Sequence, residues 1–349
     1  MGQRSVRQPR NLIFISDGTL SSDELGARSN AGRLAALLDE LGPSARQSVL
    51  YDRGIQGSGM MRWVNAATGA GIERSIRDGY AFLASRYRPG DRIYLFGYSR
   101  GAYAVRSLAG MIGRVGLLRA ERATERHVRV AFRHYTSVPP RPTLRGFREA
   151  HCHTHVPIEM LGVWDTVRAL GLPWPGLSWL APMAVSFHDA ALAHHIRHGY
   201  QALALDETRL AYRPRRWRRS PGWQGRLEQT WFPGCHGDVG GEVRHFQAAR
   251  GLANIPLNWM LRRASSHGVD LPDDWVQRFP EDPAAPSSAD RTWLAPLFVL
   301  RAPRRTGGGD GETMHLSVQA RMAALPRYRP AARATVPGET LTAAATNPA

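Results

Sequence analysis

The chain has 349 residues, of which 43% are hydrophobic and 21% charged, so it can bury a sizeable core and has an ordinary globular composition. Its two cysteines, Cys152 and Cys235, form no disulfide framework, which favours a reducing compartment. The formal net charge is +17 and the chain has no lysine, so arginine supplies the excess. Such a charge bears on association with phosphates rather than on the fold.

The sequence shows no targeting or membrane segment. Residues 1–10 are polar, and the apolar run at residues 12–15 is too short for the core of a signal peptide. The longest uncharged stretch, residues 170–187, contains Pro173, Pro175 and Pro182, which would break a spanning helix. We therefore expect a cytoplasmic protein as synthesised, which only a secretion system that reads no signal peptide could export.

Short apolar runs alternate with segments of helical periodicity along the chain. The runs predict strands at residues 12–15, 48–51, 92–96, 158–164 and 228–232. The periodic segments predict helices at residues 34–41, 72–87, 102–112, 190–205, 257–267 and 314–325. Loops are expected at residues 57–71 and 271–288 and, as a flexible basic segment, at residues 304–311.

This alternation predicts an α/β fold with a mainly parallel sheet and helices on both of its faces. We expect a single catalytic domain over residues 11–330. Residues 335–349 are small and polar, and we expect a disordered tail there.

Residues 97–101 read Gly-Tyr-Ser-Arg-Gly and match the pattern G-x-S-x-G between a predicted strand and a predicted helix. A sharp strand-to-helix turn lifts the serine hydroxyl clear of the sheet, and the glycines avoid clashes between neighbouring elements. The N-terminus of the following helix would stabilise negative charge that develops nearby. The motif therefore predicts that Ser99 is a catalytic nucleophile in an α/β-hydrolase-type fold.

Partners for this serine follow in the order that the fold requires, an acid and then a histidine. Asp165 comes directly after the predicted strand at residues 158–164, and His236 follows the strand at residues 228–232. His236 would accept the serine proton, and Asp165 would fix the imidazole tautomer and stabilise its charged form. Asp238 and His315 stay open as alternatives for the two partners.

An oxyanion hole needs N–H donors beside the serine, and the backbone of Arg100 would supply one. Gly18 or Thr19, in the turn after the first strand, would supply the second, because a glycine there lets the backbone come close to a ligand. A plain Asp-Gly turn at Asp17 explains the same residues. The mechanism requires no metal and no organic cofactor.

Two further segments carry competing interpretations. Residues 213–219 place Trp217 among arginines, which suits an anionic membrane surface or a nucleic-acid backbone but also a solvated loop. The arginines are Arg213, Arg215, Arg216, Arg218 and Arg219. The uncharged residues 170–187 predict either an apolar cap over the site or a buried connection on the sheet.

A histidine cluster is the remaining candidate for a metal site. His151, His153 and His155 would share one face of an extended strand. A zinc site wants about four ligands, and no second cluster stands out, so we expect no metal here.

The ordered motifs resemble the α/β-hydrolase family of lipase and phospholipase effectors linked to the bacterial type VI secretion system. The family's Asp-Gly-Thr turn appears at residues 17–19, and its Gly-Phe-Ser-Arg-Gly-Ala elbow at residues 97–102, with Tyr98 in place of Phe. Its Gly-Val-Trp-Asp-Thr-Val, Phe-His-Asp, Ala-Leu-Ala-Leu-Asp-Glu and Trp-Phe-Pro-Gly-x-His-x-Asp-Val-Gly-Gly motifs appear at residues 162–167, 187–189, 202–207 and 231–241.

The resemblance implies hydrolysis of lipid esters, with phospholipids as the best-known substrates, and places Ser99, Asp165 and His236 at the family's triad positions. The larger effectors have a further membrane-binding region, for which this chain has little room. We thus expect a serine esterase or lipase that cleaves carboxylic esters, of lipids or phospholipids, through an acyl-enzyme on Ser99.

Two alternatives to a lipase stay open. One is a carboxylesterase for small molecules. The other is a binding protein, either a catalytically degenerate hydrolase fold or a basic module for nucleic acid or an anionic surface. Nucleic acid is the less expected partner, because it leaves the Ser-Asp-His order unexplained.

Overall fold

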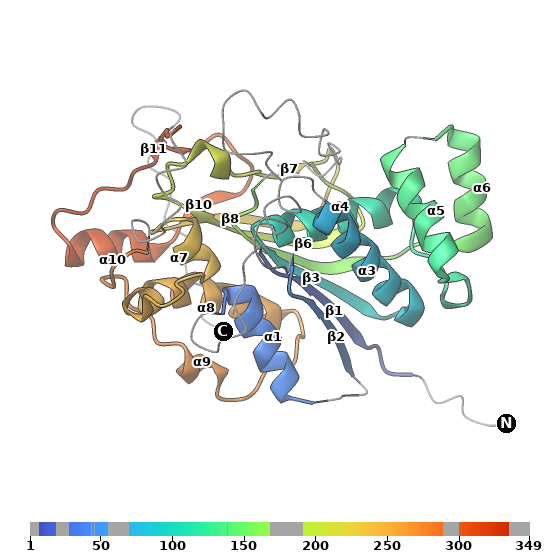
Figure 1. Ribbon diagram of the computed structural model, residues 1–349, viewed down its shortest axis with the longest axis horizontal. Helices are drawn as coiled ribbons and strands as arrows, with labels where there is room; N and C mark the ends of the chain where they lie inside the picture. The colour runs from blue at the N-terminus through green and yellow to red at the C-terminus, as the bar shows by residue number, and fades with distance from the viewer. Residues whose placement is uncertain are drawn as a thin grey trace.

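The structure is a computed structural model that describes residues 7–18, 28–42, 44, 46–54, 70–137, 139–167, 191–288 and 300–334. Within these ranges seven strands form one sheet in the order β10-β8-β6-β4-β3-β1-β2, and each neighbouring pair is parallel (Figure 1). The predicted α/β class is confirmed. The segment at residues 170–187, the tail at residues 335–349 and most of the loop at residues 57–71 lie outside the described residues.

The strands of the sheet are β1 (Asn11–Ser16), β2 (Gln47–Asp52), β3 (Arg92–Tyr98), β4 (Ile158–Trp164), β6 (Ile196–Ala204), β8 (Arg226–Phe232) and β10 (Glu312–Met314). Shorter strands pair separately, β5 (Ala191–Leu192) with β7 (Arg218–Arg219) and β9 (Arg305–Thr306) with β11 (Arg333–Ala334).

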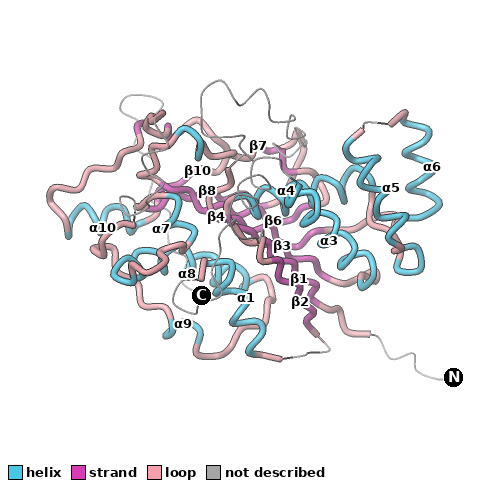
Figure 2. The backbone as a smooth tube through the Cα atoms, in the orientation of Figure 1, coloured by secondary structure: helices cyan, strands magenta, loops and turns pink. Residues whose placement is uncertain are grey.

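Helices pack on both faces of the sheet, as the sequence predicts (Figure 2). One face carries α3 (Ala70–Arg86), α4 (Arg100–Val115), α5 (Glu125–Thr136) and α6 (Arg141–His151). The other carries α1 (Asn30–Glu40), α7 (His236–Gly240), α8 (Arg250–Ser266) and α9 (Trp275–Arg278). α10 (Leu316–Ala324) and the 3-10 turns η1 (Ala120–Arg122), η2 (Leu210–Tyr212) and η3 (Gln247–Ala249) complete the described helices.

Strand β1 shows how the core divides between the two faces. All six of its residues are buried; Leu12 and Phe14 pack with α3 and α4, whereas Ile13 and Ile15 pack with α1 and α8. This is the two-fold alternation of a strand that is covered on both sides.

The strand order reverses direction beside β1. The chain passes from β1 to β2 at one edge of the sheet and then returns to β3 on the opposite side of β1. Open parallel sheets bind their ligands in the crevice that such a reversal leaves at the carboxyl ends of the strands. The ends of β1 and β3 are therefore where the fold itself favours a site.

One prediction about secondary structure is wrong, and two helices were not predicted. The helix predicted at residues 190–205 is wrong: strand β6 runs from Ile196 to Ala204 between β4 and β8. An interior strand of a parallel sheet is apolar on both faces and lacks the alternation that marks a strand. The sequence also gave no prediction for α5 and α6, although Val128, Ala131 and Tyr135 of α5 are buried at helical spacing.

Candidate active site

Ser99 lies in the turn between β3 and α4 with φ 58° and ψ −116°, a conformation that residues other than glycine rarely adopt. The neighbouring glycines make this turn sterically possible. A Cβ on Gly97 would lie 2.6 Å from the carbonyl oxygen of Gly101, and one on Gly101 would lie 2.1 Å from that of Ser16. The strain is therefore held by close packing of α4 on the ends of β1 and β3.

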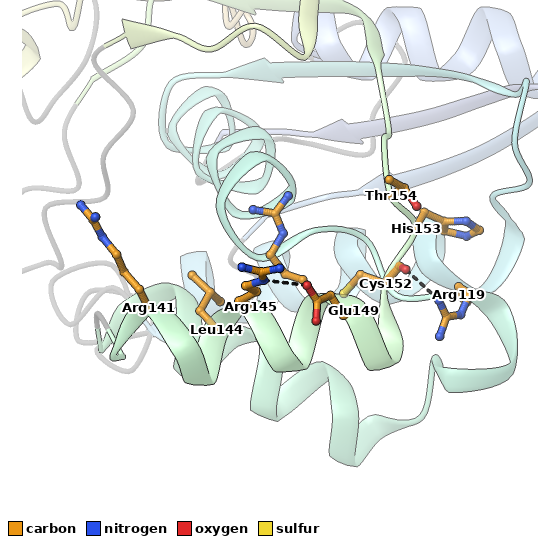
Figure 3. Close-up of a pocket in the computed structure, with 9 residues that line it drawn as sticks. Arg119, Arg141, Leu144, Arg145, Glu149, Cys152, His153 and Thr154 are labelled. Carbon is orange, nitrogen blue, oxygen red and sulfur yellow. Dashed lines mark hydrogen bonds and ion pairs between the residues drawn. The ribbon is translucent and has the colours of Figure 1, made fainter.

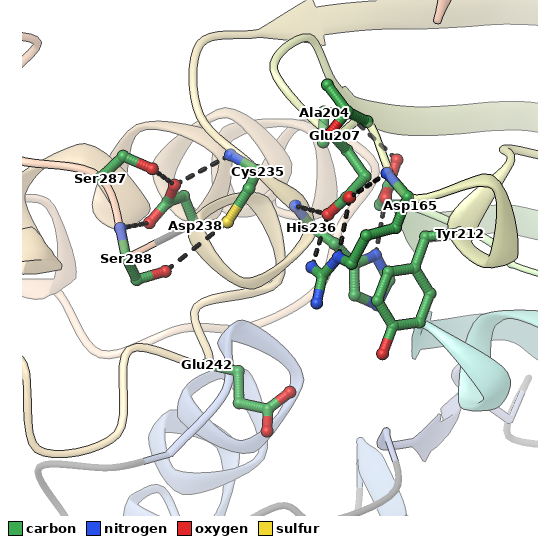
Figure 4. Close-up of polar contacts among 12 residues, drawn as sticks. Asp165, Ala204, Glu207, Tyr212, Cys235, His236, Asp238, Glu242, Ser287 and Ser288 are labelled. Atoms are coloured by element: carbon green, nitrogen blue, oxygen red, sulfur yellow. Dashed lines mark hydrogen bonds and ion pairs between the residues drawn. The ribbon is translucent and has the colours of Figure 1, made fainter. Parts of the chain in front are cut away.

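The structure brings Ser99, His236 and Asp165 together at the carboxyl end of the sheet. His236 begins α7, and its Nε2 lies 2.9 Å from Ser99 Oγ. Its Nδ1 lies 2.6 Å from Oδ2 of Asp165, which follows β4 (Figure 4). Asp165 is fully buried and His236 is 5% exposed. This is the arrangement in which an imidazole can take a serine proton while a carboxylate holds its other nitrogen.

Asp165 is surrounded by hydrogen-bond donors. Besides His236, the guanidinium of Arg304 donates to both carboxylate oxygens at 2.6 and 2.8 Å, and the Ala204 amide donates at 3.1 Å. Burial by itself raises the pKa of Asp165, but the charge of Arg304 and these hydrogen bonds outweigh it and hold that pKa well below its usual range. The carboxylate is therefore ionised beside the imidazole at neutral pH.

Arg304 is a residue that the sequence did not identify. It was expected in a flexible loop, but it is 6% exposed, and its backbone oxygen accepts from the Arg333 amide at 2.8 Å. The segment that follows Arg304 is also held in place, because the side chain of Gln229 donates to the Asp310 carbonyl at 2.6 Å. No local sequence pattern indicates that an arginine so distant in sequence from Asp165 contacts it.

Aromatic rings surround the imidazole of His236. Tyr212 stacks on it with ring centres 4.7 Å apart, and Tyr98 contacts it at 5.0 Å. The backbone amide of His236 donates to Glu207, whose carboxylate also pairs with Arg209 at 2.6 Å. Glu207 was also not among the predicted site residues, although it is the last residue of the Ala-Leu-Ala-Leu-Asp-Glu motif at residues 202–207.

The oxyanion-hole candidates are only partly described. Arg100 is the first residue of α4, directly after Ser99, where helix amides point toward the site. Gly18 lies close to the serine, since a Cβ on it would be 3.5 Å from Ser99 Cβ. Its N–H donates to the Asp17 carboxylate at 2.6 Å. Thr19 lies outside the described residues.

The alternative partners have other contacts. Asp238 accepts hydrogen bonds from the amides of Cys235 and Ser288 and from the Ser287 hydroxyl, and Figure 4 shows it turned toward these residues. His315 caps α10 through its side chain and stacks on Phe232 at 4.6 Å. Both side chains thus have structural roles that account for them.

The basic segment at residues 213–219 does not present its aromatic ring to a lipid surface. Trp217 is 2% exposed, and the Arg106 guanidinium lies 4.5 Å from its ring. Arg216 pairs with Glu312. Only Arg213, Arg218 and Arg219 of this segment are well exposed. The tryptophan is a core residue: it packs in the hydrophobic cluster that includes α3 and α4, and the side chain of Gln229 on β8 bonds to both its backbone N–H and its carbonyl.

The histidine cluster does not converge on one point. His151 is the last residue of α6 rather than part of a strand, and its ring contacts His127 and Phe147. The ring of His153 instead packs edge-on against Tyr87.

A second group of metal-ligand types lies at the opposite end of the sheet. Glu159, His198 and His267 bring ligand atoms within 4.8 Å of one another. The two imidazoles stack at 3.9 Å, however, and stacked rings direct their nitrogens alongside each other rather than toward a shared ion. The Tyr200 hydroxyl also holds Nε2 of His267 at 2.8 Å. Burial and the neighbouring His198 lower the pKa of His267 to about 4.

A cavity of about 440 Å³ opens beside α6 (Figure 3). Its lining includes Arg119, Arg141, Arg145 and Arg148, and Arg145 pairs with Glu149 at 2.7 Å. Figure 1 places α6 at an edge of the molecule, well away from α7. This basic cavity shares no lining residue with the Ser99 site.

Residues 10–263 match the family model described as T6SS, phospholipase effector Tle1-like, catalytic domain. The chain belongs to this family. A protein of Saccharomyces cerevisiae, the uncharacterized protein YEL023C, is 28% identical in an alignment of 229 residues that covers 57% of this chain and 31% of the yeast protein. The chain therefore spans about a third of the length of that relative.

Solved structures also resemble this Tle1-like domain. An uncharacterized protein from Pseudomonas aeruginosa is 17% identical, with a TM-score of 0.41, over 79% of this chain and 49% of that one. A Tle1 effector bound to the VgrG spike of the type 6 secretion system is 18% identical, with a TM-score of 0.37, over 67% of this chain and 51% of that one. In the part of the chain that the structure describes, no helix has the length and apolar character needed to cross a membrane.

Proposed function

We propose that this Tle1-like domain is a serine hydrolase that cleaves carboxylic esters of lipids, phospholipids among them, through an acyl-enzyme on Ser99. The observation that carries the proposal is the hydrogen-bonded chain from Ser99 Oγ to His236 (2.9 Å) and on to Asp165 (2.6 Å), at a strained turn of the kind that nucleophiles occupy. Membership of a phospholipase effector family supports the choice of substrate class.

In the proposed reaction Ser99 Oγ attacks the ester carbonyl carbon while its proton passes to Nε2 of His236. The backbone N–H of Arg100 at the start of α4 donates to the oxyanion, and Gly18 or Thr19 would supply the second donor. For Gly18 to do so, its N–H must leave the carboxylate of Asp17.

The imidazolium of His236 then protonates the departing alcohol oxygen, and the ester bond breaks to leave an acyl group on Ser99. Water attacks this acyl-enzyme with His236 again as base, which releases the carboxylic acid and restores the serine. Asp165 keeps its negative charge throughout and stabilises the imidazolium.

The test is hydrolysis of p-nitrophenyl esters of increasing chain length and of phospholipid vesicles. Wild type is compared with Ser99→Ala and with Ser107→Ala. Ser107 is a buried serine on α4, the helix that follows Ser99, and serves as matched control. We expect Ser99→Ala alone to lose activity, and an acyl group on the Ser99 peptide in mass spectra of the trapped enzyme. Activity that survives in Ser99→Ala would overturn the nucleophile.

The substrate profile decides between the lipase and the small-ester esterase. Preference for long acyl chains and release of fatty acid from vesicles support a lipase, whereas activity confined to short esters supports the carboxylesterase. A well-folded wild type that hydrolyses none of these substrates would favour a degenerate fold that binds without catalysis. Export without a signal peptide is part of the proposal, since the family is one of secretion effectors.

A further inference from the structure

We infer that Arg304 is a positioning residue of this site, which holds Asp165 in the orientation and charge state that His236 requires. The inference rests on the serine mechanism proposed above. It also means that the C-terminal segment, which lies beyond the matched residues 10–263, completes the active site.

The first support is the geometry of the guanidinium. Its Nη1 donates to Asp165 Oδ1 at 2.6 Å and to the Ala204 carbonyl at 2.8 Å. Its Nη2 donates to Asp165 Oδ2 at 2.8 Å and to the Tyr212 carbonyl at 2.5 Å. All four hydrogens of the two terminal nitrogens thus have partners, which fixes the plane of the carboxylate.

The same contacts reach His236 from two sides. Asp165 accepts from the imidazole, and Tyr212, whose backbone Arg304 holds, stacks its ring on that imidazole. One buried side chain therefore supports two of the groups that orient the proposed base.

The chain holds Arg304 in place through its backbone. The Ala302 amide donates to the Thr208 carbonyl at 2.8 Å, and the Leu210 amide donates to the Leu300 carbonyl at 3.1 Å. These bonds pair residues 300–302 with residues 208–210, at the start of the turn that contains Tyr212, and β9 then pairs with β11. The position is set by backbone pairing at both ends and not by a loose loop.

Arg304 and His236 also meet at one atom of the carboxylate. Nη2 of Arg304 and Nδ1 of His236 both donate to Oδ2 of Asp165, at 2.8 and 2.6 Å. A rotation of the carboxylate would therefore break its bond to the imidazole, and the paired bonds of the guanidinium oppose that rotation.

The experiment compares Arg304→Gln and Arg304→Lys through kcat and KM on a p-nitrophenyl ester. For Arg304→Gln we expect kcat to fall about 10- to 100-fold with KM nearly unchanged, since the residue is buried away from substrate. Arg304→Lys keeps the charge but loses the two-pronged geometry of the guanidinium, so its kcat should also fall while its KM stays in place.

Arg263→Gln is the matched control, because Arg263 also makes a two-pronged pair with a carboxylate, that of Glu228, at the other end of the sheet. It should keep the wild-type kcat and KM. A proton NMR signal of the His236 Nδ1–H, present in wild type and Arg263→Gln and broadened in Arg304→Gln, is expected as a second readout.

Wild-type kcat in Arg304→Gln or in Arg304→Lys, or an unbroadened Nδ1–H signal of His236 in Arg304→Gln, would overturn the inference. Should Arg304→Gln not fold, Arg304→Lys still decides through kcat at unchanged KM. Hydrolysis that survives in Ser99→Ala would instead overturn the serine mechanism itself. The two failures are therefore distinguishable.

Discussion

Replacing Asp165 by asparagine tests the assignment of the acid, because the carboxylate accepts from four N–H groups that an amide cannot all satisfy. The donors are Nδ1 of His236, both terminal nitrogens of Arg304 and the Ala204 amide. Asparagine has the same shape but offers one oxygen acceptor and one NH₂ donor. At least two of the four donors must therefore face another donor.

The orientation of the amide decides which pair is lost. An NH₂ in place of Oδ2 faces Nδ1 of His236, and the two can pair only if the imidazole carries its proton on Nε2 instead. In that tautomer Nε2 cannot accept the proton of Ser99. An NH₂ in place of Oδ1 opposes Arg304 and Ala204 instead. Either way Arg304 stays buried without a counter-charge.

The expected losses are large. Removing one partner of a buried ion pair lowers the free energy of unfolding by about 3–5 kcal/mol. The corresponding change in a serine protease lowers kcat about 10⁴-fold, and we expect a loss on that order here. The assays are urea unfolding and kcat on a p-nitrophenyl ester.

Asp238→Asn is the matched control, because Asp238 is equally buried and also accepts several hydrogen bonds, from Cys235, Ser287 and Ser288. It should cost about 1–3 kcal/mol of stability and leave kcat within about tenfold of wild type. A tenth or more of wild-type kcat in Asp165→Asn, or a larger loss in Asp238→Asn, would refute the reasoning.

Three further outcomes are expected. Gly240→Ala would set a Cβ 1.8 Å from the ring of Tyr98 and should lower the free energy of unfolding by about 1–3 kcal/mol or more. Gly146→Ala, in open space on α6, should instead raise the free energy of unfolding by about 0.5–1 kcal/mol, and thermal melts compare the two variants. Burial lowers the pKa of His315 to about 4, so the unfolded chain takes up its proton first and stability falls as pH drops from about 6.5 toward 4. His315→Asn keeps a side chain that can cap α10. Urea unfolding at pH 7 and at pH 4.5 should show that this variant loses on the order of 2 kcal/mol less stability between the two pH values than wild type. Trp217→Ala should cost about 3–5 kcal/mol and leave vesicle binding in sedimentation unchanged, because the ring is core.

The sequence predicts the elements whose pattern is local. Strands β1, β3, β4 and β8 are short buried runs between turns, and α3 and α4 repeat their apolar residues at helical spacing. Strand β6 was missed because its environment is set by its neighbours β4 and β8, which no window of the sequence contains. The narrow buried faces of α5 and α6 are hidden among arginines.

The candidate triad could be predicted for a similar reason. Ser99 and Asp165 follow a strand directly and His236 comes four residues after the end of β8, and parallel strands bring their carboxyl ends to one edge of the sheet. The position of each residue in the sequence therefore predicts its position in the sheet. Arg304 follows no strand of this sheet, and the pairing of residues 300–302 with residues 208–210 carries it to Asp165.

The charges around the proposed base show why the excess of +17 says little about the chemistry. Among the described residues, three carboxylates near His236 each pair with an arginine; the pairs are Asp165–Arg304, Glu207–Arg209 and Glu242–Arg244. The charges within each pair cancel, so proton transfer at the imidazole depends on hydrogen-bond geometry. The excess positive charge instead lies at the surface, where salt screens it, and affects which molecules the domain associates with. Added salt should accordingly weaken binding to an anionic surface while it leaves kcat on a small neutral ester unchanged.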